Sequence, residues 1–213
     1  MEFHILNLSS ILPFLRKRLR EGSIVGFSSK TLYFAKKLKA MKREFIKYIN
    51  ALDEEDLVKE LQKLYTKFPT IKKYYAMELS PSTDKIVAQY KTKIKKVYFK
   101  PNGGFGRAKS SVSRKIIAEF KRVAIHQSDV IELWVYRTEM MTKYVVGRNY
   151  YSETFFKSIA ISYETTCKLI AKEKMETEFE PRCHEIIDSV SDFWGLPEEL
   201  QWIYEQYFGN FNR

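Results

Sequence analysis

The sequence is poor in the residues on which covalent cross-links and metal sites depend. It contains 2 cysteines and 3 histidines among 213 residues. Secreted disulfide scaffolds need a spaced set of cysteines, and zinc sites need clustered cysteine and histidine ligands, so neither class fits. Cys167 and Cys183 are therefore expected to be reduced thiols. The sequence predicts no metal site and no cofactor.

Long apolar runs are also lacking. No uninterrupted apolar stretch approaches the ~20 residues that a membrane-spanning helix requires. The N-terminal segment carries its basic cluster, RKRLR, after its apolar part, whereas a secretory signal carries its charge first. We therefore expect a cytoplasmic protein that has no membrane partner.

Charge is plentiful and unevenly distributed, with a net value of +11. Residues 1–40 hold 8 basic and 2 acidic residues, residues 41–125 hold 20 and 9, and residues 126–213 hold 9 and 15. Clustered positive charge attracts polyanions, so this distribution favours RNA or a nucleoprotein as a partner of the basic part. A lysine-rich, solvated surface is the alternative interpretation.

Apolar residues recur at helical spacing along most of the chain. After Asp53, an expected N-cap, Leu57, Leu61 and Leu64 predict a helix over residues 53–67. Later segments repeat this spacing, including one whose helix is predicted to start around Pro181, and no strand-like alternation outweighs it. Short connections favour antiparallel neighbours. The predicted fold is all-α, either an irregular antiparallel helical bundle or a HEAT-like stack of helices.

Met41 opens the first sustained helical pattern. The preceding residues show little periodicity, which is typical of a chain terminus that does not pack. We interpret residues 1–40 as an N-terminal extension, either poorly ordered or translated upstream sequence. Residues 41–213 are interpreted as a single helical domain with a basic first half and an acidic last third.

Three glycines gather in the segment NGGFGRAKSS, residues 102–111. A phosphate-binding loop of the G-x-x-x-x-G-K-[ST] type follows a buried strand, but here Ala108 replaces the second glycine and a lysine-rich helical pattern precedes the loop. A dinucleotide-binding loop would need glycine where Lys109 stands. The segment therefore does not fit an NTPase. It leads into a predicted helix N-terminus, which favours anions.

Basic residues flank this glycine-rich segment on both sides. We predict eight phosphate contacts, namely Lys91, Lys95, Lys96, Arg107, Lys109, Arg114, Lys115 and Arg122. Tyr98 and Phe105 are predicted to stack on bases. The sequence shows no RRM, KH or cold-shock motif of the kind typical of single-strand readers. An exposed loop that carries solubilising charge is the alternative interpretation.

Other candidates for chemistry are sparse. Cys183 and His184 are adjacent in a predicted helix, which directs them about 100° apart and prevents a thiolate–imidazole pair. His184 and Asp188 share a face and are predicted to form a solvated pair. No catalytic residue is predicted. The aromatic residues near the C-terminus are expected to close the core, and an exposed docking face is the alternative.

Several stretches together resemble a known family. They are MKREFIKYINALDEEDLVKELQKLYTKFPTIKKYY, YFKPNGG, SRKIIAEFKR and YYSETFFKSIAISYE. Over about residues 41–210, the sequence is similar to a family of small bacterial proteins that is catalogued only as a domain of unknown function. The resemblance implies a helical fold in a bacterial, intracellular setting. It assigns no catalytic residue.

Three hypotheses for function follow. The first is a non-catalytic helical protein that contacts a polyanion, RNA or a nucleoprotein, through its basic face. The second is a protein–protein adaptor without nucleic-acid contact, and the third is an enzyme whose site is not recognisable in the sequence. Convergence of the basic residues on one face favours the first hypothesis, whereas scattering or neutralisation by glutamates would remove it.

Overall fold

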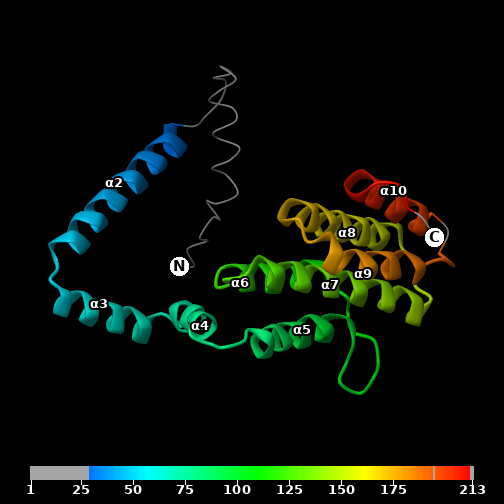
Figure 1. Cartoon of the computed structure of the whole chain (residues 1–213). Helices are drawn as coiled ribbons and strands as arrows, with labels where there is room; N and C mark the ends of the chain where they lie inside the picture. Colours follow the sequence, from blue (N-terminus) through cyan, green and yellow to red (C-terminus); the bar gives the residue numbers. More distant parts are fainter. Residues whose placement is uncertain (1–28, 194, 212–213) are drawn as a thin grey trace. The chain divides into compact units, whose positions relative to one another are not determined.

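The computed structural model describes residues 29–193 and 195–211 (Figure 1). Over these residues the protein has nine helices and no strand, with one isolated antiparallel bridge between Phe99 and Phe105. The predicted all-α fold class is therefore confirmed. The chain divides into two compact units, one ending at Lys63 and the other beginning at Leu64.

The first unit contains α2 (Ser29–Ala51) and most of α3 (Glu54–Lys67). The Asp56 N–H donates to Oδ1 of Asp53 over 2.8 Å, so Asp53 caps α3 as the sequence predicts. Helix α2 runs across residue 41, where a division of the chain is expected. That division stays a prediction, because residues 1–28 lie outside the described part of the chain.

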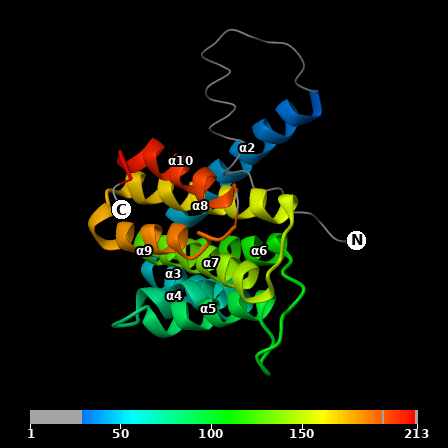
Figure 2. The ribbon, with the colours of Figure 1, turned by 90° about the vertical axis from the view of Figure 1, so that its right-hand side faces the viewer.

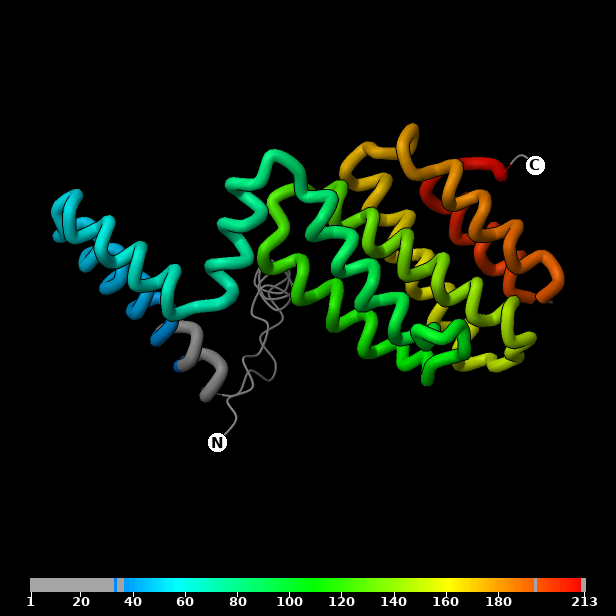
Figure 3. The backbone as a smooth tube through the Cα atoms, turned by 90° about the horizontal axis from the view of Figure 1, so that it is seen from below, coloured from blue at the N-terminus to red at the C-terminus, as the bar shows by residue number. Residues whose placement is uncertain are grey.

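The second unit contains the remaining seven helices of the described residues. They are α4 (Pro69–Glu78), α5 (Asp84–Tyr98), α6 (Ser110–Lys121), α7 (Gln127–Arg148), α8 (Glu153–Glu173), α9 (Glu176–Asp188) and α10 (Leu196–Phe208). Helix α7 is central: it packs against α5 and α6 on one side and against α8 and α9 on the other (Figure 2). Helix α10 covers α8 and α9. Helices α5 and α7 run side by side (Figure 3).

The core of this unit surrounds α7. This helix buries apolar residues around most of its circumference, as expected for a helix enclosed between two layers. Cys167 of α8 and Cys183 of α9 are free thiols, and both are fully buried. Burial raises the pKa of the Cys167 thiol, so it stays protonated and unreactive at neutral pH.

Helix α9 differs from the sequence prediction. The pattern predicts a helix that starts around Pro181, but α9 begins at Glu176 and contains Pro181 in its interior. Proline lacks an N–H group, so the helix loses one backbone hydrogen bond there. Phe179 and Cys183 are both buried on either side of the proline, and their packing outweighs this loss. None of the helices among the described residues is long and apolar enough to cross a membrane.

Candidate nucleic-acid interface

The glycine-rich loop between α5 and α6 closes the C-terminus of α5. The Gly106 N–H donates to the Tyr98 carbonyl over 2.7 Å, and the Ala108 N–H donates to the Val97 carbonyl over 3.0 Å. A Cβ atom at Gly106 would lie 2.7 Å from the same Val97 oxygen, so only glycine permits this approach. A phosphate-binding loop reserves such N–H groups for its ligand. Their use here supports the view that the loop is not an NTPase loop.

Phe105 fixes the other side of the loop to α7. Its ring meets the Tyr144 ring edge-on, with 5.6 Å between the ring centroids, and it lies against Gly147. The Tyr144 hydroxyl also donates to the Gly106 carbonyl over 3.4 Å. Phe105 is half-buried by these contacts. Its predicted stacking on a base therefore stays a prediction that uses only the exposed part of the ring.

Tyr98 is fully buried, and its predicted stacking role is wrong. Its ring has 0% exposure, and its hydroxyl lies 2.7 Å from the Ser113 hydroxyl of α6. The residue continues the buried stripe of Tyr90 and Ile94 at four-residue spacing, which directs it into the core. Burial raises the pKa of Tyr98, so its hydroxyl is neutral at physiological pH.

Three of the eight predicted phosphate contacts converge on one open depression of about 380 Å³. Lys96 reaches it from α5, and Arg107 and Lys109 reach it from the loop before α6. Lys93, which sequence reasoning did not select, joins them. We call this surface the basic depression. It is lined by Lys93, Lys96, Val97, Arg107, Lys109, Val112 and Ile116. The lining thus combines four cations with three apolar side chains.

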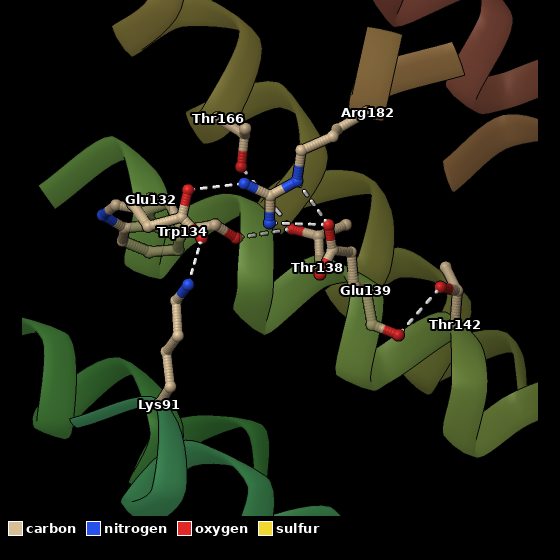
Figure 4. Close-up of polar contacts among 8 residues, drawn as sticks. All are labelled: Lys91, Glu132, Trp134, Thr138, Glu139, Thr142, Thr166 and Arg182. Atoms are coloured by element: carbon tan, nitrogen blue, oxygen red, sulfur yellow. Dashed lines mark hydrogen bonds and ion pairs between the residues drawn. The ribbon is translucent and has the colours of Figure 1, made fainter. Parts of the chain in front are cut away.

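Lys91 does not join this surface. Its Nζ lies 2.6 Å from Oε1 of Glu132 on α7, so its charge is compensated (Figure 4). Glu132 also pairs with Arg182 of α9, which in turn contacts Glu139 over 2.7 Å (Figure 4). Lys91 lines a different depression, in which most of the charged side chains are acidic. The structure therefore argues against Lys91 as a phosphate contact.

The other predicted contacts are exposed, but they do not line the basic depression. They are Lys95, Arg114, Lys115 and Arg122. Arg122 forms the C-cap of α6, whereas Lys109 precedes the other end of the same helix. The eight basic residues are thus brought together only in part, at the end where α5 meets the loop before α6.

Arg137 is a buried charged residue that sequence reasoning missed. It comes from the middle of α7 and is 1% exposed. Its Nε donates to the Ser113 hydroxyl over 2.9 Å, and its Nη2 donates to the Ser110 hydroxyl over 2.6 Å. Burial lowers the pKa of the Arg137 guanidinium, and the Tyr98 hydroxyl opposes this effect. Its four-residue spacing from Leu133, which is also buried, places Arg137 on a buried face of α7 and is the signal in the sequence that indicates its burial.

A model of a family of unknown function, DUF6155, matches residues 40–208, well over half of the chain. The chain belongs to this family. The resemblance to a domain of unknown function is therefore confirmed, whereas a bacterial source stays a prediction. The DUF6155 match includes every residue of the basic depression. No curated protein and no solved structure matches the chain.

The remaining candidates for a catalytic or metal-binding role in this DUF6155 member lie in its C-terminal part. His184 is half-buried: its Nε2 lies 2.8 Å from the Tyr204 hydroxyl, and its ring stacks on Phe211 with 4.5 Å between centroids. The Tyr204 hydroxyl donates to Glu180. Desolvation and this carboxylate raise the pKa of Tyr204. Among the described residues, no group of three potential ligands is placed to hold a metal ion.

The C-terminal aromatic residues divide between core and surface. Phe193 and Tyr204 are buried, as core closure requires, but Trp202 is 62% exposed. Trp194 lies outside the described residues. The expected core closure is therefore confirmed for Phe193 and Tyr204, whereas Trp202 presents its indole ring to solvent.

Proposed function

We propose that this protein is a non-catalytic helical protein that binds a polyanion through the basic depression, and RNA is the ligand to test first. The observation that carries this proposal is the convergence of Lys93, Lys96, Arg107 and Lys109 around one hollow. Closely spaced cations create a positive potential that attracts phosphates and releases their counterions on binding. A nucleoprotein would offer the same phosphate groups.

The lack of carboxylate partners for these four cations among the described residues supports the proposal. None of the four lies within ion-pair distance of a carboxylate in the described part of the chain, in contrast to Lys91. Binding a phosphate would therefore break no existing ion pair. Val97, Val112 and Ile116 add apolar surface that a base or sugar can cover. The depression thus combines charge for the backbone with apolar surface for the rest of a nucleotide.

Fluorescence anisotropy with labelled single-stranded RNA tests the proposal directly. We expect saturable binding of the full chain at low salt, and clearly weaker binding by the Lys96→Gln/Arg107→Gln double variant. The control variant Lys157→Gln/Lys172→Gln removes the same charge from exposed positions on α8 and is expected to bind as the wild type does. Absence of binding by the wild type, or equal affinity of the two double variants, would contradict the proposal.

Exposed apolar side chains in the first unit favour a second candidate function, that of a protein–protein adaptor. Phe45 and Ile46 of α2 and Val58 and Leu61 of α3 are each about half exposed, and α3 has no buried residue. Exposed apolar faces of this kind are typical of surfaces that bind another protein. An adaptor predicts a protein partner that remains bound after nuclease treatment. A partner that is lost after nuclease treatment would favour the polyanion instead.

A further inference from the structure

Helix α3 carries a narrow apolar stripe along one face. Four large side chains form this α3 stripe, and each is between 44% and 48% exposed, namely Val58, Leu61, Tyr65 and Phe68. Steps of three, four and three residues are the spacing of positions a and d in a coiled coil. Because α3 has only 14 residues and buries none of them, it gains little stability from packing. The spacing of the α3 stripe therefore fits a partner helix.

The two ends of the α3 stripe carry opposite charge. Glu54 lies at the start, in an acidic first turn. At the other end, Nζ of Lys67 lies 5.8 Å from the centroid of the Phe68 ring. Nζ of Lys72 lies 5.8 Å from the centroid of the Tyr65 ring. None of these three charges takes part in an ion pair within the described part of the chain. A second copy of α3 in the opposite direction would complement both ends.

We propose that two copies of this chain associate through α3, in antiparallel orientation about a two-fold axis. The spacing of the α3 stripe reads the same in both directions, so Leu61 packs against Tyr65 of the second copy. Glu54 then lies beside Lys72 of the second copy, and the two-fold axis repeats each contact. A parallel pair of α3 helices would instead bring like charges together at both ends.

Helix α2 is less suited to self-association than α3. It contains seven basic residues and one acidic residue, so two copies of it would repel each other. Helix α3 contains three basic and four acidic residues, which nearly balance. A contact between two single helices is smaller than the ~1,200–2,000 Å² of a stable interface. We therefore expect a dimer that dissociates on dilution. No residue of α3 lines the basic depression, so the dimer does not depend on RNA binding.

Sedimentation velocity of the full chain over a range of concentrations tests the dimer. The protein is treated with nuclease first, so that no nucleic acid bridges two copies. We expect the average mass to rise from that of one chain toward that of two. Leu61→Asp places a carboxylate in the middle of the α3 stripe and should weaken the dimer about tenfold or more. Ile161→Asp is the matched control, because Ile161 is an exposed apolar residue of α8. It should dimerise as the wild type does.

Charge reversal tests whether the partner is an antiparallel second copy. Glu54→Lys and Lys72→Glu should each weaken the dimer about fivefold, because each variant places two like-charged pairs in it. A mixture of the two variants should dimerise as the wild type does, since opposite charges then face each other at both ends. A wild type that is monomeric at every concentration would leave the α3 stripe to a different protein and overturn the proposal. Unchanged dimerisation of Leu61→Asp, or a mixture no better than its components, would also overturn it.

Discussion

Gly106 determines, as a single residue, how the loop before α6 packs on α5. Its missing side chain allows hydrogen bonds to the C-terminal carbonyls of α5, and these bonds hold Arg107 and Lys109 beside Lys96. A Cβ atom would collide with backbone rather than with a mobile side chain. The backbone of the loop would therefore have to move away from α5.

We predict that Gly106→Ala lowers the free energy of unfolding by about 1–3 kcal/mol, the usual cost of overpacking. Urea denaturation followed by circular dichroism measures this change. Gly104→Ala is the matched control, because its Cβ would meet only the side chains of Asn102 and Lys100 at ordinary contact distances. A Gly106→Ala variant as stable as Gly104→Ala would show that the loop does not need this close approach.

Two residues that are expected at the surface from their residue type are instead buried in the core. Tyr98 is predicted to stack on a base, although its four-residue spacing from Ile94 places it on the buried stripe. Arg137 is charged, and charge normally predicts exposure. Its burial follows from serine hydroxyls on α6, which lie 24 and 27 residues away in the sequence. No local pattern reveals such partners.

At the scale of elements, Arg182 joins α9 to the central helix α7. It contacts Glu132 and Glu139, and all three side chains are largely removed from solvent (Figure 4). We predict that Arg182→Gln destabilises the protein by about 1–2 kcal/mol, because two half-buried carboxylates lose their shared cation. Thermal unfolding measures the effect.

The exposed pair of Lys157 and Glu153 provides the control for this prediction. Both side chains are mostly in solvent, so Lys157→Gln should change stability by less than about 0.5 kcal/mol. If Arg182→Gln and Lys157→Gln have equal effects on Tm, the contact between α9 and α7 does not depend on the charge of Arg182.

Helix α4 is joined to α6 by a pH-dependent contact. Lys73 of α4 lies 2.6 Å from Glu119 of α6, and this hydrogen bond lowers the pKa of Glu119 below its ordinary value of 4.5. Because the folded pKa is depressed, the contact stabilises the protein above about pH 4.5 and is lost as pH falls through the folded value.

Hydrogen exchange of the α4 amides tests this contact. We predict that Glu119→Gln lowers the protection factors in α4 at pH 7, and that the difference from wild type disappears at a pH below the folded pKa of Glu119. Amides of α8 provide an internal reference, since α8 makes no part of this contact. A difference that persists unchanged in acid would assign the effect to packing and not to charge.

The sequence predicts helices more reliably than the contacts between them. Helix α3 ends where the pattern of Leu57, Leu61 and Leu64 predicts, because its cap and apolar spacing are local signals. The predicted start of α9 is wrong, because proline is a local signal that long-range packing overrides. The pairing of Lys91 with Glu132 joins α5 to α7 and could not be predicted, because it depends on how these helices are arranged.

At the scale of the whole molecule, basic residues outnumber acidic ones in residues 1–125, whereas acidic residues outnumber basic ones in residues 126–213. Glutamates of the acidic last third neutralise part of the basic half, as the pair of Lys91 and Glu132 shows. Segregation of charge along the sequence therefore predicts an anionic partner but not the positions that bind it. The folded chain brings four of the remaining cations together around the basic depression.

The salt dependence of RNA binding tests the central proposal most directly. Full-length wild type is compared with a variant in which Lys93, Lys96, Arg107 and Lys109 are all changed to glutamine. The control variant changes four other exposed lysines to glutamine, namely Lys143, Lys157, Lys168 and Lys172. Each variant removes four positive charges, so both have the same net charge, and any difference between them comes from where the charges lie.

We predict that log Kd against log salt concentration is steep for the wild type and for the control variant. The slope should become shallower by about 3 in the depression variant, because each lost contact with single-stranded nucleic acid removes about 0.7 from it. Equal slopes for the two variants, or wild-type binding that does not respond to salt, would contradict binding of a polyanion at the basic depression.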